Sequence, residues 1–238
     1  MESKSQRAIL AVFAHPDDET SAAGATMARY VREGVGVYVA TATRGELGAL
    51  GTNGMVVTRE DLPKLREQEL RSVLQLYGVK PPFLLGYRDQ EVERAPFEEV
   101  IAKVLTIMRQ VQPDVVITFG PLGISRHADH LAIHMATVDA FHRYRRETAR
   151  EPRLFFTAIP AETAQRFELN LFGPEVSPTI LVDTKETVAL KVKALRTYRS
   201  QEDAQWLAEV FEKQAPAVEA FHQAWPPVAN GTVATGFW

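Results

Sequence analysis

One histidine and three carboxylates lie almost side by side near the start of the chain: His15, Asp17, Asp18 and Glu19. They follow residues 8–14, an apolar run with the length of a buried parallel strand. Unpaired charges are costly to bury, so such a cluster at the end of a strand indicates a bound cation, a reaction, or both.

A second group of polar side chains follows another apolar run, residues 114–119, and a Gly-Pro break. In it, His127 and His130 are three positions apart around an expected helix start, a spacing that lets both rings face one cavity. The remaining histidines are expected to pack in the core or lie at the surface: His134, His142 and His222.

Strand-like and helix-like segments alternate along the chain, which is typical of βαβ units and a parallel sheet. We therefore predict one α/β domain over residues 1–238, with a Rossmann-like, doubly wound, mostly parallel sheet flanked by helices. Its core sheet is expected within about residues 7–160 and a C-terminal strand and helices within about 179–225. Residues 160–178 are expected to form an irregular loop that contains proline.

In a doubly wound sheet, the first strand lies beside the strand that opens the second half, and ligands bind at their carboxyl ends. The His15 cluster follows the first strand and the His127 cluster follows the fourth. This topology predicts that the two clusters meet at the switch point.

Two histidines and one carboxylate match a catalytic zinc site that leaves a position for water. A metal lowers the pKa of such water, and a nearby carboxylate can take the proton. Asp17 and Asp18 are adjacent, so we expect one to bind the metal and the other to face the water. His127, if cationic, could stabilise an oxyanion, with Asp129 holding its ring.

The composition argues against several other classes of protein. The formal net charge is -3, there is no cysteine, and no basic stripe suggests a nucleic-acid partner. No apolar run approaches the roughly 18 residues that a membrane span needs, and the first residues lack the apolar core of a signal peptide. We expect a cytoplasmic protein without a membrane or nucleic-acid partner. The His-Pro-Asp-Asp-Glu turn also disfavours dinucleotide binding, because it lacks the glycine fingerprint and its carboxylates would repel a pyrophosphate.

These motifs resemble a known family. The His-Pro-Asp-Asp-Glu sequence of residues 15–19, together with the later His-x-Asp-His of residues 127–130, is similar to the PIG-L/LmbE-like zinc-dependent N-acetylglucosaminide deacetylases. Bacterial members of that family include enzymes of bacillithiol and mycothiol synthesis. The resemblance extends to Thr-Arg-Gly-Glu at residues 43–46 and to residues 193–201.

The resemblance implies a role for each matching residue. His15, Asp18 and His130 would be the zinc ligands, and Asp17 the general base. Ferrous iron also suits a site of two histidines and a carboxylate.

By the same resemblance, His127 would stabilise the tetrahedral intermediate, Asp129 would orient His127, and Arg44 would hold substrate. One departure is Ala128, where the family usually has proline, a difference that concerns the shape of the loop rather than the ligand set. No role is assigned at this point to three further polar residues: Glu19, Glu46 and Ser125.

The expected activity is removal of the acetyl group from an N-acetylglucosamine-type sugar conjugate, a small amino-sugar substrate. Two alternatives stay open: an amidase of a thiol-sugar conjugate or another small acylated amine on the same site, and a non-catalytic protein that binds metal or sugar. The presence of Asp17 argues against the second. The loops at residues 44–57 and 160–178 are expected to shape substrate choice. The resemblance also suggests a homo-oligomer, a trimer or hexamer.

Overall fold

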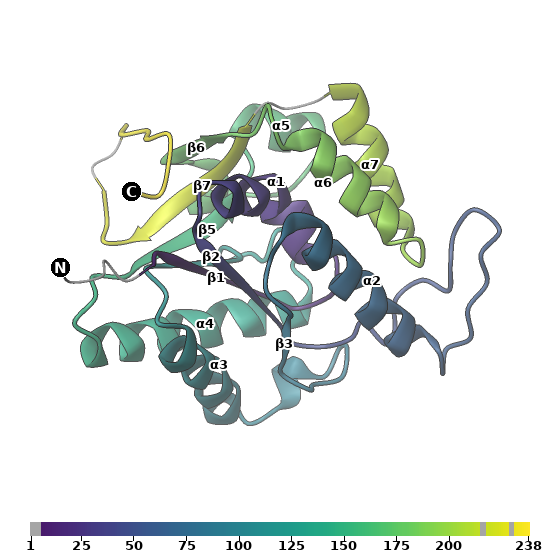
Figure 1. Cartoon of the computed structure of the whole chain (residues 1–238), viewed down its shortest axis with the longest axis horizontal. Coiled ribbons are helices and arrows are strands. Elements are labelled where there is room, and N and C mark those ends of the chain that lie inside the picture. The colour runs from purple at the N-terminus through teal and green to yellow at the C-terminus, as the bar shows by residue number, and fades with distance from the viewer. Residues whose placement is uncertain (1–5, 215–217, 229–230) are drawn as a thin grey trace.

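A computed structural model describes residues 6–214, 218–228 and 231–238. Strands and helices alternate through most of the chain (Figure 1). In chain order the elements are β1 (Ala8–Phe13), α1 (Asp18–Arg32), β2 (Gly36–Thr41), α2 (Leu62–Tyr77), β3 (Phe83–Leu84), the 3-10 helix η1 (Val92–Arg94), α3 (Phe97–Val111), β4 (Val115–Thr118), α4 (Ala128–Glu147), β5 (Arg153–Ala158), α5 (Ala161–Arg166), the 3-10 helix η2 (Gly173–Val176), β6 (Ile180–Asp183), α6 (Val188–Thr197), α7 (Glu202–Gln214) and β7 (Val218–Trp225).

The strands form one seven-stranded sheet in the order β3-β2-β1-β4-β5-β7-β6. The first five strands of this order pair in parallel, whereas β7 is antiparallel to both of its neighbours, β5 and β6. The prediction of a doubly wound, mostly parallel sheet is therefore confirmed. Strand β7 was not predicted, because its buried stretch carries polar residues such as Glu219 and Gln223 in place of a β-branched run.

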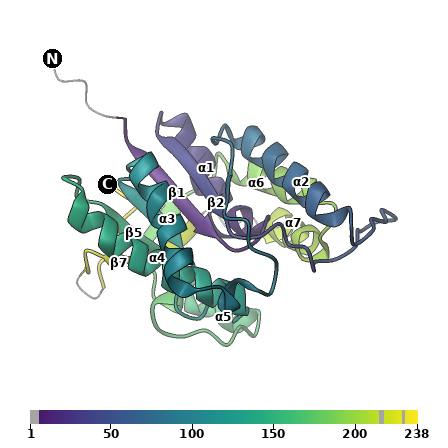
Figure 2. The same ribbon diagram turned by 90° about the horizontal axis from the view of Figure 1, so that it is seen from below.

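Helices cover both faces of the sheet. Helices α1, α2, α6 and α7 pack together on one face, and α3 and α4 pack together on the other (Figures 1 and 2). Strands β1 and β4 are buried along their whole length, as their continuous apolar sequences require. The core between these layers fixes the ends of β1 and β4, and with them the polar turns that follow.

Residues 160–178 are more regular than the sequence suggested, since they contain α5 and η2. The end of the chain also packs on its own fold: the Phe237 ring is fully buried and contacts Tyr30, Phe155 and Phe221. Over the described residues, no helix is both long and apolar enough to cross a membrane.

Candidate metal centre

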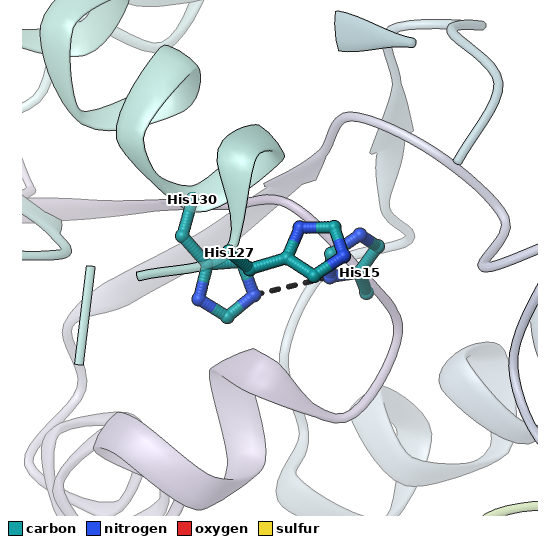
Figure 3. A group of neighbouring side chains, drawn as sticks. All are labelled: His15, His127 and His130. Carbon is teal, nitrogen blue, oxygen red and sulfur yellow. Dashed lines mark hydrogen bonds between the residues drawn. The ribbon is translucent and has the colours of Figure 1, made fainter. Parts of the chain in front are cut away.

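The two polar clusters meet where the topology predicted, beyond the carboxyl ends of the adjacent strands β1 and β4. His15 follows β1, while His127 caps the N-terminus of α4 and His130 lies in its first turn. Their three rings face one another in Figure 3, with ring centroids 4.8 to 5.2 Å apart. This meeting point is the candidate functional site.

Three donor atoms at this point form a nearly regular triangle. His15 Nδ1 lies 3.1 Å from His130 Nε2. The Asp18 Oδ2 atom lies 3.4 Å from His15 Nδ1 and 3.5 Å from His130 Nε2. Tetrahedral zinc with bonds of about 2.0–2.1 Å needs donors roughly 3.3 Å apart. The residues present therefore fit a divalent metal without rearrangement.

Each histidine of the triangle is held by a bond at its other nitrogen. His130 Nδ1 lies 2.8 Å from the Gly123 carbonyl, with the Ser125 hydroxyl 3.3 Å away. His15 Nε2 lies 3.2 Å from a carboxylate oxygen of Asp129 and 3.2 Å from one of Asp89. Because a carbonyl or carboxylate accepts the N–H, the opposite nitrogen of each ring is left free to bind a metal.

The histidines and carboxylates of the cluster stabilise each other's charged forms. Burial alone would lower the pKa of His15, but its contacts with Asp129, Asp18 and Asp89 outweigh burial and raise that pKa well above the usual value. Burial opposes ionisation of Asp18, yet the two nearby histidines, His130 and His15, lower its pKa. The main-chain N–H of His15 also donates to Asp18 Oδ2 at 2.7 Å. A buried carboxylate that stays ionised between two histidines suits a cation.

Asp129 contacts a different histidine from the one expected. Its carboxylate bonds to His15 and accepts the main-chain N–H groups of Gln90 (2.7 Å) and Val92 (3.1 Å). The expected partner, His127, receives only the main-chain N–H of Asp129, at 3.2 Å from Nδ1. The reason is that the fully buried Asp129 side chain points toward residues 90–92, where it accepts two main-chain N–H groups.

Nδ1 of His127 accepts the main-chain N–H of Asp129, so a neutral His127 ring carries its proton on Nε2. Burial, together with the charges of His15 and His130, lowers the pKa of His127 and favours that neutral form. One of its ring nitrogen atoms also lies within 4.8 Å of a ring nitrogen of each of the other two histidines. His127 is therefore placed to donate one hydrogen bond beside the triangle.

Asp17 lies in a strained turn at the start of α1, with φ at +103°. Its carboxylate accepts a hydrogen bond from Arg66 at 2.8 Å, and its main-chain N–H donates to Glu19 at 3.0 Å. Burial raises the pKa of Asp17 well above the usual value, although Arg66 opposes this. The fully buried Glu19 also accepts the hydroxyl of Tyr198 at 2.6 Å, which ties the turn to the end of α6.

The arginine that reaches the site is Arg66. It is buried, and it donates to the Pro16 and Gly45 carbonyls as well as to Asp17. Gly45 has a left-handed φ of +63°, and a Cβ there would lie 1.9 Å from the Arg66 guanidinium, so the position needs glycine. The side chain of Arg44 is instead 46% exposed and pairs with Glu67 at 2.6 Å.

Two site residues were missed from the sequence, Arg66 and Asp89. Asp89 follows the parallel strand β3, and its N–H donates to Glu46 at 3.0 Å. Its position after a parallel strand was a signal that went unused. Arg66 lies on the stripe of α2 that faces the core, four positions after Leu62, and a charge on such a stripe was the second signal.

Comparisons with known proteins show which family the chain resembles. The family model described as "PIG-L: GlcNAc-PI de-N-acetylase" matches residues 10–141. A Bacillus cereus protein named probable N-acetyl-alpha-D-glucosaminyl L-malate deacetylase 2 is 34% identical, over 84% of this chain and 86% of its own length. A Kineococcus radiotolerans 1D-myo-inositol 2-acetamido-2-deoxy-alpha-D-glucopyranoside deacetylase is 38% identical, but the match covers 56% of this chain and only 44% of that protein.

Among solved structures, the N,N'-diacetylchitobiose deacetylase of Pyrococcus horikoshii superposes with a TM-score of 0.66 at 25% identity, over 92% of this chain and 84% of the other. The fold, the matched sequence and the order of the motifs all indicate the same family. The chain belongs to the PIG-L family.

Proposed function

We propose that this protein is a zinc-dependent N-deacetylase that removes the acetyl group from an N-acetylglucosamine-type sugar conjugate. The observation that carries the proposal is the triangle of His15 Nδ1, His130 Nε2 and Asp18 Oδ2, with edges of 3.1 to 3.5 Å. The names of the relatives, all deacetylases of acetamido sugars, support the choice of substrate class. Zinc is the proposed metal because two histidines and one carboxylate match a catalytic zinc site, and ferrous iron suits the same donors.

When bound, the divalent metal would polarise both the water and the amide carbonyl. The Asp17 carboxylate then takes one proton from the water as its oxygen attacks the acetyl carbon, and returns that proton to the nitrogen of the leaving amine. The C–N bond breaks to give a free amino sugar and acetic acid, which releases its remaining proton to solvent as acetate. His127 Nε2–H donates a hydrogen bond to the oxyanion that develops on the carbonyl oxygen.

The proposal takes the chain as one domain, since β1 and β7 belong to the same sheet. It also takes the protein as cytoplasmic, as the sequence led us to expect.

The test is release of acetate by the zinc-loaded protein from a panel of N-acetylglucosaminides: the malate and inositol conjugates and a chitin disaccharide. The decisive variant is Asp17→Asn, whose amide oxygen can still accept the Arg66 hydrogen bond. We expect it to retain zinc while kcat falls by about 10²–10⁴-fold. Asp139→Asn, on the far part of α4, serves as the matched control.

Each negative result has a distinct meaning. Wild-type protein that binds zinc but releases no acetate from any member of the panel would contradict the sugar deacetylase assignment and favour another amide. Full activity of Asp17→Asn would instead show that Asp17 is not the base.

A further inference from the structure

The loop between β4 and α4, residues 119–127, has an unusual backbone. Gly123, Ile124 and Arg126 all have left-handed φ values of +60° to +62°. Residues other than glycine keep this conformation only when their surroundings hold them there. The same loop supplies His127 and the Gly123 carbonyl that contacts His130 Nδ1. Whatever fixes this loop therefore fixes two histidines of the candidate metal centre.

The buried carboxylate of Glu175, in η2, binds the main chain of this loop. Its Oε2 accepts the main-chain N–H of Leu122 and its Oε1 accepts that of Ile124, both at 3.1 Å. The residue is fully buried, so its charge would be costly without these bonds. Burial raises the pKa of Glu175, while the two N–H groups and the charge of Arg126 act in the opposite direction.

Gly120 lies directly against the side chain of Glu175. A Cβ on Gly120 would lie 2.2 Å from Cγ of Glu175, closer than atoms can approach. The φ of Gly120 is not in the left-handed region, so the backbone itself would accept alanine. Glycine is needed at this position to make room for the Glu175 carboxylate.

The main chain of Glu175 is itself anchored to the sheet. Its carbonyl accepts the N–H of Ile159, at the end of β5, at 2.7 Å. A second tie joins the same segment to the loop, because Arg126 donates to the Asn170 carbonyl at 3.0 Å. The main chain of Glu175 is therefore held by the sheet independently of the loop that its side chain binds.

We propose that Glu175 is a positioning residue of the metal centre. By binding two N–H groups of the 119–127 loop, it holds the Gly123 carbonyl on His130 Nδ1 and so keeps His130 Nε2 directed at His15 and Asp18. The bonds of Glu175 go to Leu122, Ile124 and Ile159 and not to the candidate metal ligands, and none of the motifs in the sequence includes it. The inference rests on the proposed metal centre.

The first test is Glu175→Gln. The amide has the same size, but its NH₂ group would meet one of the two loop N–H groups donor to donor. We expect zinc affinity, measured by competition with a chromophoric chelator, to fall by about 10-fold or more. We also expect kcat to fall by a similar factor while KM stays within twofold. In the zinc-free protein, the NMR signal of the His130 Nδ1–H should shift or broaden.

Two further variants keep the test decisive. Glu162→Gln, an exposed residue of α5 in the same segment, should leave all three measurements unchanged. Gly120→Ala should reproduce the effects of Glu175→Gln by displacing the carboxylate, and it carries the test should Glu175→Gln fail to fold. If both variants fold, judged by circular dichroism, and keep wild-type zinc affinity and the His130 signal, the proposal is wrong. The zinc and NMR readouts need no substrate, so they remain valid even if the deacetylase assignment fails.

Discussion

His130 and His134 lie one turn apart on the same face of α4 and look alike in two respects. Each Nδ1 lies 2.8 Å from a main-chain carbonyl, that of Gly123 for His130 and that of Phe119 for His134. Each ring also packs on a phenylalanine: His130 stacks on Phe119 at 4.1 Å, and His134 meets Phe156 edge-on at 4.9 Å.

The two histidines differ at the other ring nitrogen. Nε2 of His130 lies 3.1 Å from His15 Nδ1 and 3.5 Å from Asp18. For His134, no carboxylate of the described chain forms an ion pair with the ring, and burial lowers its pKa. A carbonyl bond on Nδ1 is therefore not enough to make a histidine a candidate metal ligand. What distinguishes His130 is the tip of β1, which brings two more donors to its free nitrogen.

The largest expected effect is the loss of zinc affinity when His130, but not His134, is replaced. His130→Ala removes one corner of the donor triangle, so we expect zinc affinity to fall by more than about 100-fold, beyond the usual effect of an outer-shell change. His134→Ala removes a similar ring from the same helix face and should keep zinc affinity within a few-fold. Chelator competition measures both. Equal losses in the two variants would mean that the affinity reflects the stability of α4 and not ligation.

A smaller effect is expected at His127, the third histidine on this helix face. In His127→Asn, the side chain can still cap α4 but loses the Nε2–H donor. We expect kcat to fall about 100-fold, as for removal of one oxyanion donor, with little change in zinc affinity. Steady-state kinetics and chelator competition separate the two. Loss of zinc comparable to that of His130→Ala would instead make His127 a ligand, in a site of three histidines.

The sequence predicted the meeting of the two clusters because both features needed are local. A continuous apolar run identifies a buried strand, and the polar residues directly after it must lie at its carboxyl end. His15 after β1 and His130 after β4 follow this rule, and the neighbouring order of β1 and β4 then brings them together. The place of the site could therefore be predicted from the strand ends, whereas the choice of His15, Asp18 and His130 as ligands came from the resemblance to the family.

The supporting contacts could not be predicted in this way, because they join residues far apart in the chain. Asp129 bonds to His15 rather than to the nearby His127, owing to the direction in which its side chain is buried. Arg66 reaches Asp17 across 49 positions, and Glu175 reaches Ile124 across 51. Each of these is a charged residue whose burial depends on the packing of another element, which a local pattern does not reveal.

The smallest expected effect is on the pH dependence of the free energy of unfolding, and it tests whether His134 is a packed, neutral residue. Because burial lowers its pKa below the unfolded value of about 6.5, the unfolded chain binds a proton more readily than the folded one. Stability contributed by neutral His134 is thus present above about pH 6.5 and is lost as the pH falls toward the lowered pKa. His134→Asn keeps an N–H donor for the Phe119 carbonyl but cannot be protonated.

Urea unfolding of the metal-free proteins at pH 7.5 and 5.5 provides the measurement. Relative to wild type, the free energy of unfolding of His134→Asn should fall less between the two pH values, by on the order of 1 kcal/mol, since one pKa unit corresponds to about 1.4 kcal/mol. His222→Asn is the matched control, because His222 also bonds through Nδ1 to a main-chain carbonyl, that of Ser177, but lies near the surface. If the free energy of unfolding of His134→Asn depends on pH as that of wild type does, the His134 ring has the same pKa in the folded and unfolded chains. Packing would then not hold His134 neutral.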